Sequence, residues 1–563
     1  MNSRFAVAPQ VNINRSTFRR DHTVKTSFNM GELIPFCVEE VLPGDTFSIK
    51  TSKLIRTQPL LTPLMDQLYL DTYWYFVPNR LIWEHWINFM GENTDGSWIP
   101  ETQYSVPTVS APSSTGWIEH TLADYMGLPV NVPSSSDGVF SVSALPFRAY
   151  CKIYNDWFRD ENLCDPAFLP LDDSTRVGSN GDSLNDVCLG GMPLKSGKIH
   201  DYFSSCLPAP QKGSPVSLGL ESVYGDGFVP VFGNGLSLGL HNSERLFGIS
   251  SSNSSGLLGA SSNAVGNPLG TTTSSIVPIQ NKSIGVLTKS GLDAVGLPYK
   301  DTGLVADVSQ SSLTVNSLRY AFAVQRLLEK DARGGSRYIE QIKSHFGVTS
   351  PDARLQRSEY LGGNRININI NQVLNVAQAQ KTGSSEGMLG NVAGYSVTGD
   401  SHGDFSKSFT EHGYIIGLMT VRQDNSYCQG TDRFWKRKTR FDYYYPVFAN
   451  IGEQPVYQSE IYETGSNSDI VFGYQEAWAD YRFKPSKVTG MMRNQLDAWH
   501  LADKYNNPPV LGKTWIESDK ANLDRALAVT SSTADQFFAD IFIENKCTRP
   551  MPMFSIPGLL DHN

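Results

Sequence analysis

The most concentrated chemical feature of the sequence is a basic and aromatic run at 433–441, Arg-Phe-Trp-Lys-Arg-Lys-Thr-Arg-Phe. Cations can hold phosphates while neighbouring rings stack on unpaired bases, so this run is a candidate nucleic-acid contact. A solvated strand with a buried aromatic face explains the same pattern, and the sequence leaves both interpretations open. The candidate phosphate ligands are Arg433, Lys436, Arg437, Lys438 and Arg440, and the candidate stacking residues are Phe434 and Trp435.

A second basic segment occupies residues 1–30, where five cations face a single acid, Asp21. The segment has few apolar residues and is predicted to be a basic arm, although a frayed terminus would look the same. The whole chain is acidic, with 47 basic and 56 acidic residues, so any contact with nucleic acid must be local. The candidate ligands in the arm are Arg4, Arg15, Arg19 and Arg20.

Motifs for catalysis are weak. The sequence at 235–239 fits G-x-S-x-G, but it lies in a Gly/Ser-rich stretch and does not join a strand to a helix. The sequence at 512–514 resembles the end of a phosphate-binding loop, yet Asn507 replaces the first glycine, and Pro508 and Pro509 lack N–H donors. No histidine or cysteine spacing suits zinc. We therefore expect no catalytic residue, no metal site and no cofactor.

The composition limits the class of protein. Of 563 residues, 40% are hydrophobic and 11% aromatic, which excludes a disordered chain. Only 18% are charged, and such a neutral surface suits a subunit that is covered by its neighbours. No signal peptide and no apolar run of about 18 residues is found. Seven cysteines without a C-x-x-C pair predict free thiols from a reducing cytosol.

The candidate residues must be positioned by secondary structure. The sequence predicts strands near both ends of the chain and helices between them. One sheet system built from distant segments explains this order better than two separate β domains. We predict strands at 33–38, 46–49, 71–77, 414–421, 441–448, 456–462, 474–483 and 536–544. We predict helices at 79–90, 146–163, 317–330 and 338–346, with Gly91 as a left-handed end.

The chain divides into four regions by composition. Residues 1–30 are the basic arm, 31–210 the first part of a β core with helical insertions, and 316–563 the remainder of the core and the tail. Glycine and serine supply 35 of the 105 residues at 211–315, where apolar residues are interspersed. Such a surface would be sticky if exposed alone, so we expect 211–315 to be an insertion that packs with copies or partners.

Many short segments, in order along nearly the whole chain, resemble the major capsid proteins (VP1/F type) of gokushoviruses, which are small single-stranded DNA phages of the Microviridae. The similarity fades at 211–315, as expected of the variable region of that family. The segments that carry the resemblance are 16–22, 25–29, 33–36, 40–47, 76–81, 89–92, 146–150, 157–163, 337–340, 345–348, 350–352, 354–357, 359–363, 452–454, 460–462, 474–476 and 556–562.

The resemblance implies an eight-stranded viral jelly-roll β-barrel with long loop and helical insertions, assembled into a T=1 icosahedral shell around circular single-stranded DNA. It also implies that 211–315 forms threefold protrusions that contact the host surface. The implied partners are identical subunits, the genome, an internal scaffolding protein, a minor spike or pilot protein and a small basic DNA-binding protein. The implied location is the virion, after assembly in the host cytoplasm.

A structural protein that is not an enzyme is therefore expected, with the arm and the 433–440 run facing the genome. The alternative is a β-rich carbohydrate-binding protein or glycoside hydrolase, which would show a concave site with convergent carboxylates. A cell-surface adhesin would need an export signal.

Overall fold

The computed structural model describes residues 14–92, 102–134, 139–214, 216, 315–374 and 392–554, and five short strands between 231 and 306. The chain divides into two compact units. One combines Met1–Gly213 with Leu328–Asn563, and the other is Ser214–Leu327. The expected insertion at 211–315 lies mostly outside the described residues, so its boundaries stay a prediction.

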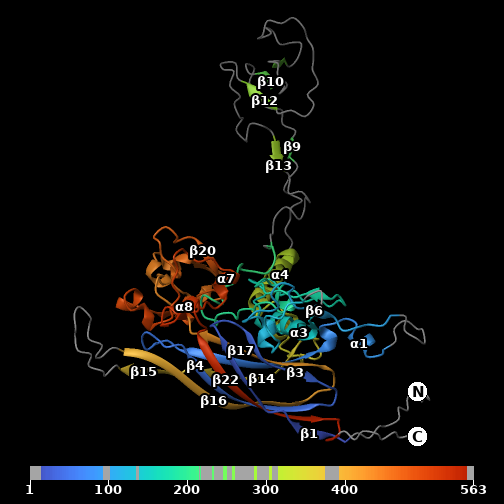
Figure 1. Ribbon diagram of the computed structural model, residues 1–563. Helices are drawn as coiled ribbons and strands as arrows, with labels where there is room; N and C mark the ends of the chain where they lie inside the picture. Colours follow the sequence, from blue (N-terminus) through green and yellow to red (C-terminus); the bar gives the residue numbers. More distant parts are fainter. Residues whose placement is uncertain are drawn as a thin grey trace. The chain divides into compact units, whose positions relative to one another are not determined.

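The first unit is built on a six-stranded antiparallel sheet (Figure 1). Strands β1 and β2 follow one another along the same edge of β22, and β4, β16 and β15 continue the sheet on the other side. Both ends of the described chain thus meet in one sheet. The strands are β1 (Ser16–Arg19), β2 (His22–Phe28), β22 (Phe537–Arg549), β4 (Thr46–Thr57), β16 (Val392–Ser408) and β15 (Ile370–Leu374).

A four-stranded antiparallel sheet faces the first one, in the order β14, β5, β17, β3. Its two central strands, β5 and β17, are buried on both faces and read as nearly continuous apolar runs, which differs from the strict alternation of β4 and β22. The edge strand β14 is only partly buried. The strands are β14 (Glu359–Asn367), β5 (Leu68–Pro78), β17 (Gly413–Gln423) and β3 (Ile34–Val41).

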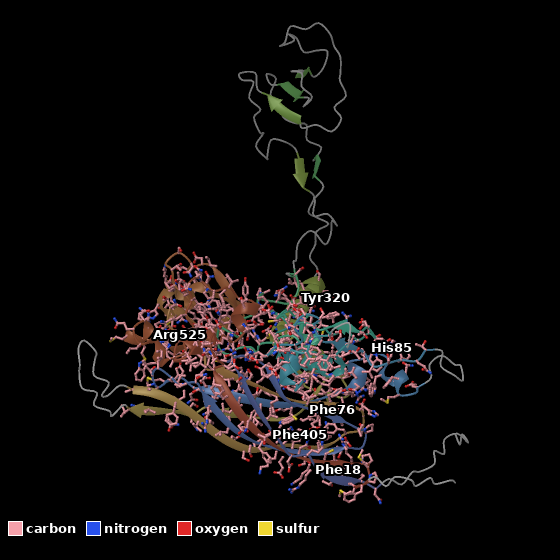
Figure 2. All side chains as sticks on the ribbon, in the orientation of Figure 1. Phe18, Phe76, His85, Tyr320, Phe405 and Arg525 are labelled. Atoms are coloured by element: carbon pink, nitrogen blue, oxygen red, sulfur yellow. The ribbon has the colours of Figure 1, made fainter. Side chains whose placement is uncertain are left out.

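The main core lies between these two sheets. Trp74 of β5 is fully buried there, and its ring centroid is 5.1 Å from that of Phe36 on β3 and 5.7 Å from that of Phe405 on β16. Phe76, which Figure 2 labels above Phe405, packs in the same cluster. Aromatic pairs of this kind join the two sheets through dense side-chain packing.

A second core covers the opposite face of the four-stranded sheet. Tyr75, Val77 and Ile416 point away from the first core and pack against helix α3 (Leu145–Ile153). The Tyr150 hydroxyl, fully buried, donates to the Leu33 carbonyl at 2.7 Å. The first unit is therefore layered as open sheet, buried sheet and helical cover, which Figure 1 shows from the side.

Most of the remaining elements are short. The other helices are α1 (Trp86–Phe89), α2 (Leu122–Tyr125), α4 (Val315–Gly334), α5 (Tyr338–Phe346), α6 (Ala479–Arg482), α7 (Lys513–Ile516) and α8 (Ala521–Asp524). The other strands of the first unit are β6 (Thr108–Ser110), β7 (Ser141–Ser143), β8 (Arg176–Val177), β18 (Ser426–Tyr427), β19 (Glu453–Tyr457), β20 (Val471–Glu476) and β21 (Ser486–Lys487). The second unit holds β9 (Val231–Gly233), β10 (Arg245–Ile249), β11 (Leu257–Gly259), β12 (Ile284–Leu287) and β13 (Leu304–Ala306). Among the described residues, no helix has the length and apolar character needed to cross a bilayer.

The mainly β character is confirmed, but several expected elements are wrong. Segment 441–448 is two 3₁₀ turns, since Pro446 lacks the N–H that a central strand would use. Segment 474–483 is a strand only to Glu476, where β20 ends; Trp478, whose φ of 65° is left-handed, then precedes α6. The predicted left-handed Gly91 is found, with φ 104°, but the helix before it shrinks to α1.

The N-terminal arm and the β-barrel also differ from what the sequence predicted. Ser16–Phe28 is not a free arm, because β1 and β2 pair with β22 and Phe28 is buried. The described strands form two facing antiparallel sheets, and no closed eight-stranded barrel is found among them.

Replacing Trp74 with alanine should destabilise the first unit strongly, because it opens a cavity between the sheets. We expect the free energy of unfolding to fall by about 3–5 kcal/mol. Urea denaturation followed by circular dichroism measures it. The control is Val510→Ala, whose side chain is exposed and which should change stability by less than about 0.5 kcal/mol. An unchanged midpoint for Trp74→Ala would contradict the core described above.

Candidate nucleic-acid interface

The basic run at 433–440 folds as a loop with two 3₁₀ turns, Arg433–Lys436 and Arg440–Asp442. It is therefore not the strand with a buried aromatic face that the sequence left open. Phe434 is 49% exposed and Trp435 is 72% exposed, with ring centroids 4.7 Å apart. Both rings are accessible for stacking on a ligand.

Three of the five cations in this loop face carboxylates of the same chain. Lys436 Nζ lies 2.5 Å from a carboxylate oxygen of Glu463. Arg437 forms an ion pair with Asp480, and its guanidinium also lies 4.2 Å from the ring centroid of Tyr481. These contacts hold the loop against the segments that follow it, so they are structural contacts.

The third structural cation is Arg433, beside the buried carboxylate of Glu460. Burial raises the pKa of Glu460. Burial alone would lower the pKa of Arg433, but Glu460, Tyr202 and Asp480 together outweigh it, so the pKa of Arg433 is raised. The hydrogen bond from Lys436 lowers the pKa of Glu463. Each of these pairs reduces the positive potential that a phosphate would meet.

Lys438 and Arg440 differ from the other three cations. Both are exposed, and in the part of the chain that the structure describes neither pairs with a carboxylate. Arg440 lies 4.7 Å from the ring centroid of Phe441. Asp442 accepts the backbone N–H groups of Thr439 and Lys438, which lowers the pKa of its carboxyl group and fixes the turn between the two cations. Charge available to a ligand is thus concentrated at Lys438 and Arg440.

The N-terminal candidates are also divided between structural and free cations. Arg15 donates to the Gly44 carbonyl at 2.5 Å, and Arg20 lies 2.5 Å from a carboxylate oxygen of Glu39. Arg19 points outward from β1 and is exposed. Arg4 lies outside the described residues.

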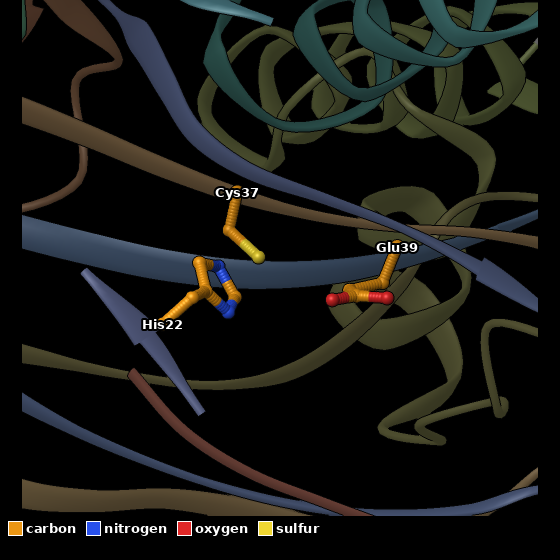
Figure 3. A group of neighbouring side chains, drawn as sticks. All are labelled: His22, Cys37 and Glu39. Atoms are coloured by element: carbon orange, nitrogen blue, oxygen red, sulfur yellow. The ribbon is translucent and has the colours of Figure 1, made fainter. Parts of the chain in front are cut away.

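His22, Cys37 and Glu39 bring one ligand-type atom each within 4.8 Å of one another, on β2 and β3 (Figure 3). Protein groups already contact them. His22 Nδ1 is 2.9 Å from the Arg20 carbonyl oxygen, and the Glu39 carboxylate is bonded by Asn545 Nδ2 at 3.0 Å and paired with Arg20. Burial raises the pKa of the Cys37 thiol, which disfavours the thiolate that a metal would need. The Glu39 contacts therefore connect β3 to Arg20 and to β22.

The carbohydrate alternative requires a concave site with two carboxylates. A pocket of about 710 Å³ is lined by two, Asp160 and Glu340. Asp160 accepts the backbone N–H groups of Asn162 and Leu163. Glu340 accepts the Arg337 N–H at the start of α5 and pairs with the Arg337 side chain. Both carboxylates thus cap local turns, and neither is placed as a free acid or base.

The structure gives no support to the two other motifs, the G-x-S-x-G sequence and the phosphate-loop sequence. The G-x-S-x-G sequence at 235–239 lies outside the described residues. Gly512 precedes α7, a helix of four residues, and Lys513 lies 3.9 Å from Glu517 one turn later. So short a helix offers a phosphate only a weak dipole.

Comparison with known proteins gives matches over nearly the whole chain. The model of a family described as capsid protein (F protein) matches residues 6–559. The chain is 39% identical to capsid protein VP1 of Chlamydia phage 1, covering 99% of this chain and 98% of that one. It is 37% identical to capsid protein VP1 of Bdellovibrio phage phiMH2K, with 98% and 97% covered. It is 39% identical to capsid protein VP1 of Spiroplasma virus 4, with 97% and 96% covered.

The division of the basic loop predicts different effects for neighbouring cations. Arg437→Gln should lower the free energy of unfolding by about 1–3 kcal/mol, because it leaves the partly buried Asp480 carboxylate without its partner. Lys438→Gln should change stability by less than about 0.5 kcal/mol. Thermal denaturation of the two variants measures the difference, and equal melting temperatures would refute a structural role for Arg437.

Proposed function

Because the chain belongs to the phage capsid protein (F protein) family, we propose that copies of it assemble into a T=1 icosahedral shell that encloses a circular single-stranded DNA genome. The chain is a major capsid protein, and the observation that carries this is end-to-end similarity to three VP1 proteins at 37–39% identity. Its role is structural, and it works as part of the virion.

The surface of the first unit supports assembly. Around the basic loop, large side chains are exposed together, among them Phe441, Tyr443 and Tyr481. Monomeric proteins rarely expose such a patch, and aromatic residues are enriched where subunits meet. Closed symmetry allows many contacts of modest strength to act together, so that no single interface has to be large.

The finer architecture belongs to the same proposal. The two facing sheets would form the jelly-roll core, and 211–315 would form a protrusion at each threefold axis that contacts the host surface. An internal scaffolding protein, a minor spike or pilot protein and a small basic DNA-binding protein would be the further partners. Assembly would occur in the host cytoplasm. The family resemblance supports each of these points.

The genome contacts of the basic loop would be made by its free groups. Lys438 and Arg440 would hold phosphates, and Phe434 and Trp435 would stack on bases. Arg19, and Arg4 of the segment before β1, would extend this interface. Arg433, Lys436, Arg437, Arg15 and Arg20 would act indirectly, since their ion pairs and hydrogen bonds shape the surfaces.

The proposed assembly predicts that the purified protein forms closed shells of uniform diameter. Electron microscopy of negatively stained material measures this, and we expect particles about an order of magnitude wider than a single domain. A stable monomer or small oligomer with glycosidase activity would refute the proposal and favour the carbohydrate alternative.

The free cations of the loop predict a packaging defect without an assembly defect. Lys438→Gln/Arg440→Gln particles should form in normal yield but lose DNA at lower salt than unmodified particles, because each lost cation removes a phosphate contact. Nuclease digestion of particles over a salt series measures retention. Replacing all five cations would confound the result, because three are structural. Equal retention in the double variant would contradict a genome contact at this loop.

A further inference from the structure

The outward face of the six-stranded sheet is open to solvent. In β22 and β4 every second side chain is buried in the core, and the residues between them point outward. No described residue of the other layers packs on that side in the two main cores. We call this surface the open face. Its outward residues include Lys25, Ser48, Lys50, Ser52, Arg56, Phe538, Asp540, Phe542, Glu544 and Lys546.

Strand register places these residues in rows. Arg19 on β1 lies opposite Lys546 on β22, and Lys546 lies opposite Ser48 on β4. In another row, Glu544 lies opposite Lys50. Directly opposed side chains are about 5 Å apart at Cβ, so these residues form one local group.

Charge on the open face is positive. No ion pair within 4 Å is formed by Arg19, Lys25, Lys50 or Arg56 among the residues that the structure describes, which contrasts with the structural cations of the basic loop. Strand register places Lys25 opposite Asp540 and Lys50 opposite Glu544, so two acids remain near these cations. The fifth cation, Lys546, lies 3.1 Å from Glu544. Its hydrogen bond lowers the pKa of Glu544, and Lys50 and Arg19 lower it further. Asp540 and Glu544 are the acids among the outward residues named above.

A hollow of about 410 Å³ opens on this face where β16 is irregular. The register of β16 against β4 shifts between Gly403 and Phe405, so Asp404 is an extra residue at a β-bulge. Lys50, Lys546 and the Ser48 and Ser406 side chains line the hollow, as does Glu544. Two ammonium groups with two hydroxyl groups offer the donors that a phosphate accepts.

Two aromatic rings continue the same face away from the hollow. Phe542 and Phe538 point outward from β22 and are 44% and 42% exposed. They are four residues apart on one strand, a spacing of roughly 13 Å. The Ser52 and Ser401 hydroxyls beside Phe542 bond to each other at 3.0 Å, and their small side chains leave the ring accessible from above.

We propose that the open face binds single-stranded nucleic acid, with a backbone phosphate in the hollow beside Lys50 and Lys546 and bases stacked on Phe542 and Phe538. The inference rests on the proposed function for its ligand and adds a site that the basic loop does not provide. Charge complementarity favours a polyanion, and exposed rings between cations on a flat sheet favour unpaired bases. In duplex DNA the bases already stack on one another, so Phe542 and Phe538 would have no free base to stack on.

Gly403 allows a substitution that tests the hollow with little effect on folding. A Cβ atom added there would meet no atom within 4 Å, and its φ is not left-handed. Gly403→Glu puts a negative charge beside the hollow, and Gly403→Gln is its neutral match. Fluorescence anisotropy of labelled oligothymidylate with the purified full-length protein should show several-fold weaker binding for Gly403→Glu only. Equal affinities for the two variants would overturn the proposal.

Two further variants separate phosphate contacts from stacking. Lys50→Gln/Lys546→Gln should lower the slope of log affinity against log salt by about 0.7, the value for the loss of one phosphate contact on a single strand. Phe538→Ala/Phe542→Ala should weaken oligothymidylate binding at least about fivefold while binding of inorganic polyphosphate is unchanged. Circular dichroism checks that each variant is folded.

The outcomes distinguish this site from the proposed function. If unmodified protein forms no shells, the proposed function fails, whereas shells with unchanged binding in all variants overturn only the open-face site. Shell assembly that is lost in Phe538→Ala/Phe542→Ala, with oligothymidylate binding unchanged, would assign the face to a second copy of the chain and would also overturn the inference.

Discussion

Pairing between the two ends of the chain is the constraint on which the first unit depends. β22 lies between the N-terminal strands and β4, so Phe28 is opposite Phe537 and Thr51 is opposite Ile543. Without β22, β1 and β2 have no pairing partner, only β4, β16 and β15 stay joined, and the core loses Phe537, Ile541 and Ile543. Closing so long a loop costs entropy that only the completed core recovers. The core therefore forms only after the C-terminal strand has been synthesised.

The pleat of the same strands gives the sheet two different faces. Ile541 and Ile543 enter the core, while Phe542 between them faces solvent. A register shift of one residue would exchange these faces, so burial of the core also fixes the arrangement of charges and rings on the outside. Stability and ligand binding are thus set by one register, although they use different side chains.

The sequence was a good guide to the β core and a poor guide to which cations are free. Alternation and apolar runs predicted strands near β3, β4, β5, β17 and β22, and ordered similarity along the chain predicted the family. The partners of the basic loop, Glu463 and Asp480, are distant in sequence, so no local pattern showed that Lys436 and Arg437 are paired. Lys50 and Lys546 were missed as candidate ligands because they become neighbours only through strand register.

The seven cysteines have a consequence for the particle outside the cell. All are buried as free thiols, and burial raises the pKa of every one, to about 11 for Cys164 and Cys188. A protonated, inaccessible thiol neither attacks disulfides nor oxidises readily. A capsid built from this chain can then remain in air-saturated water without covalent cross-links forming between its subunits through these thiols, and its opening needs no reductant.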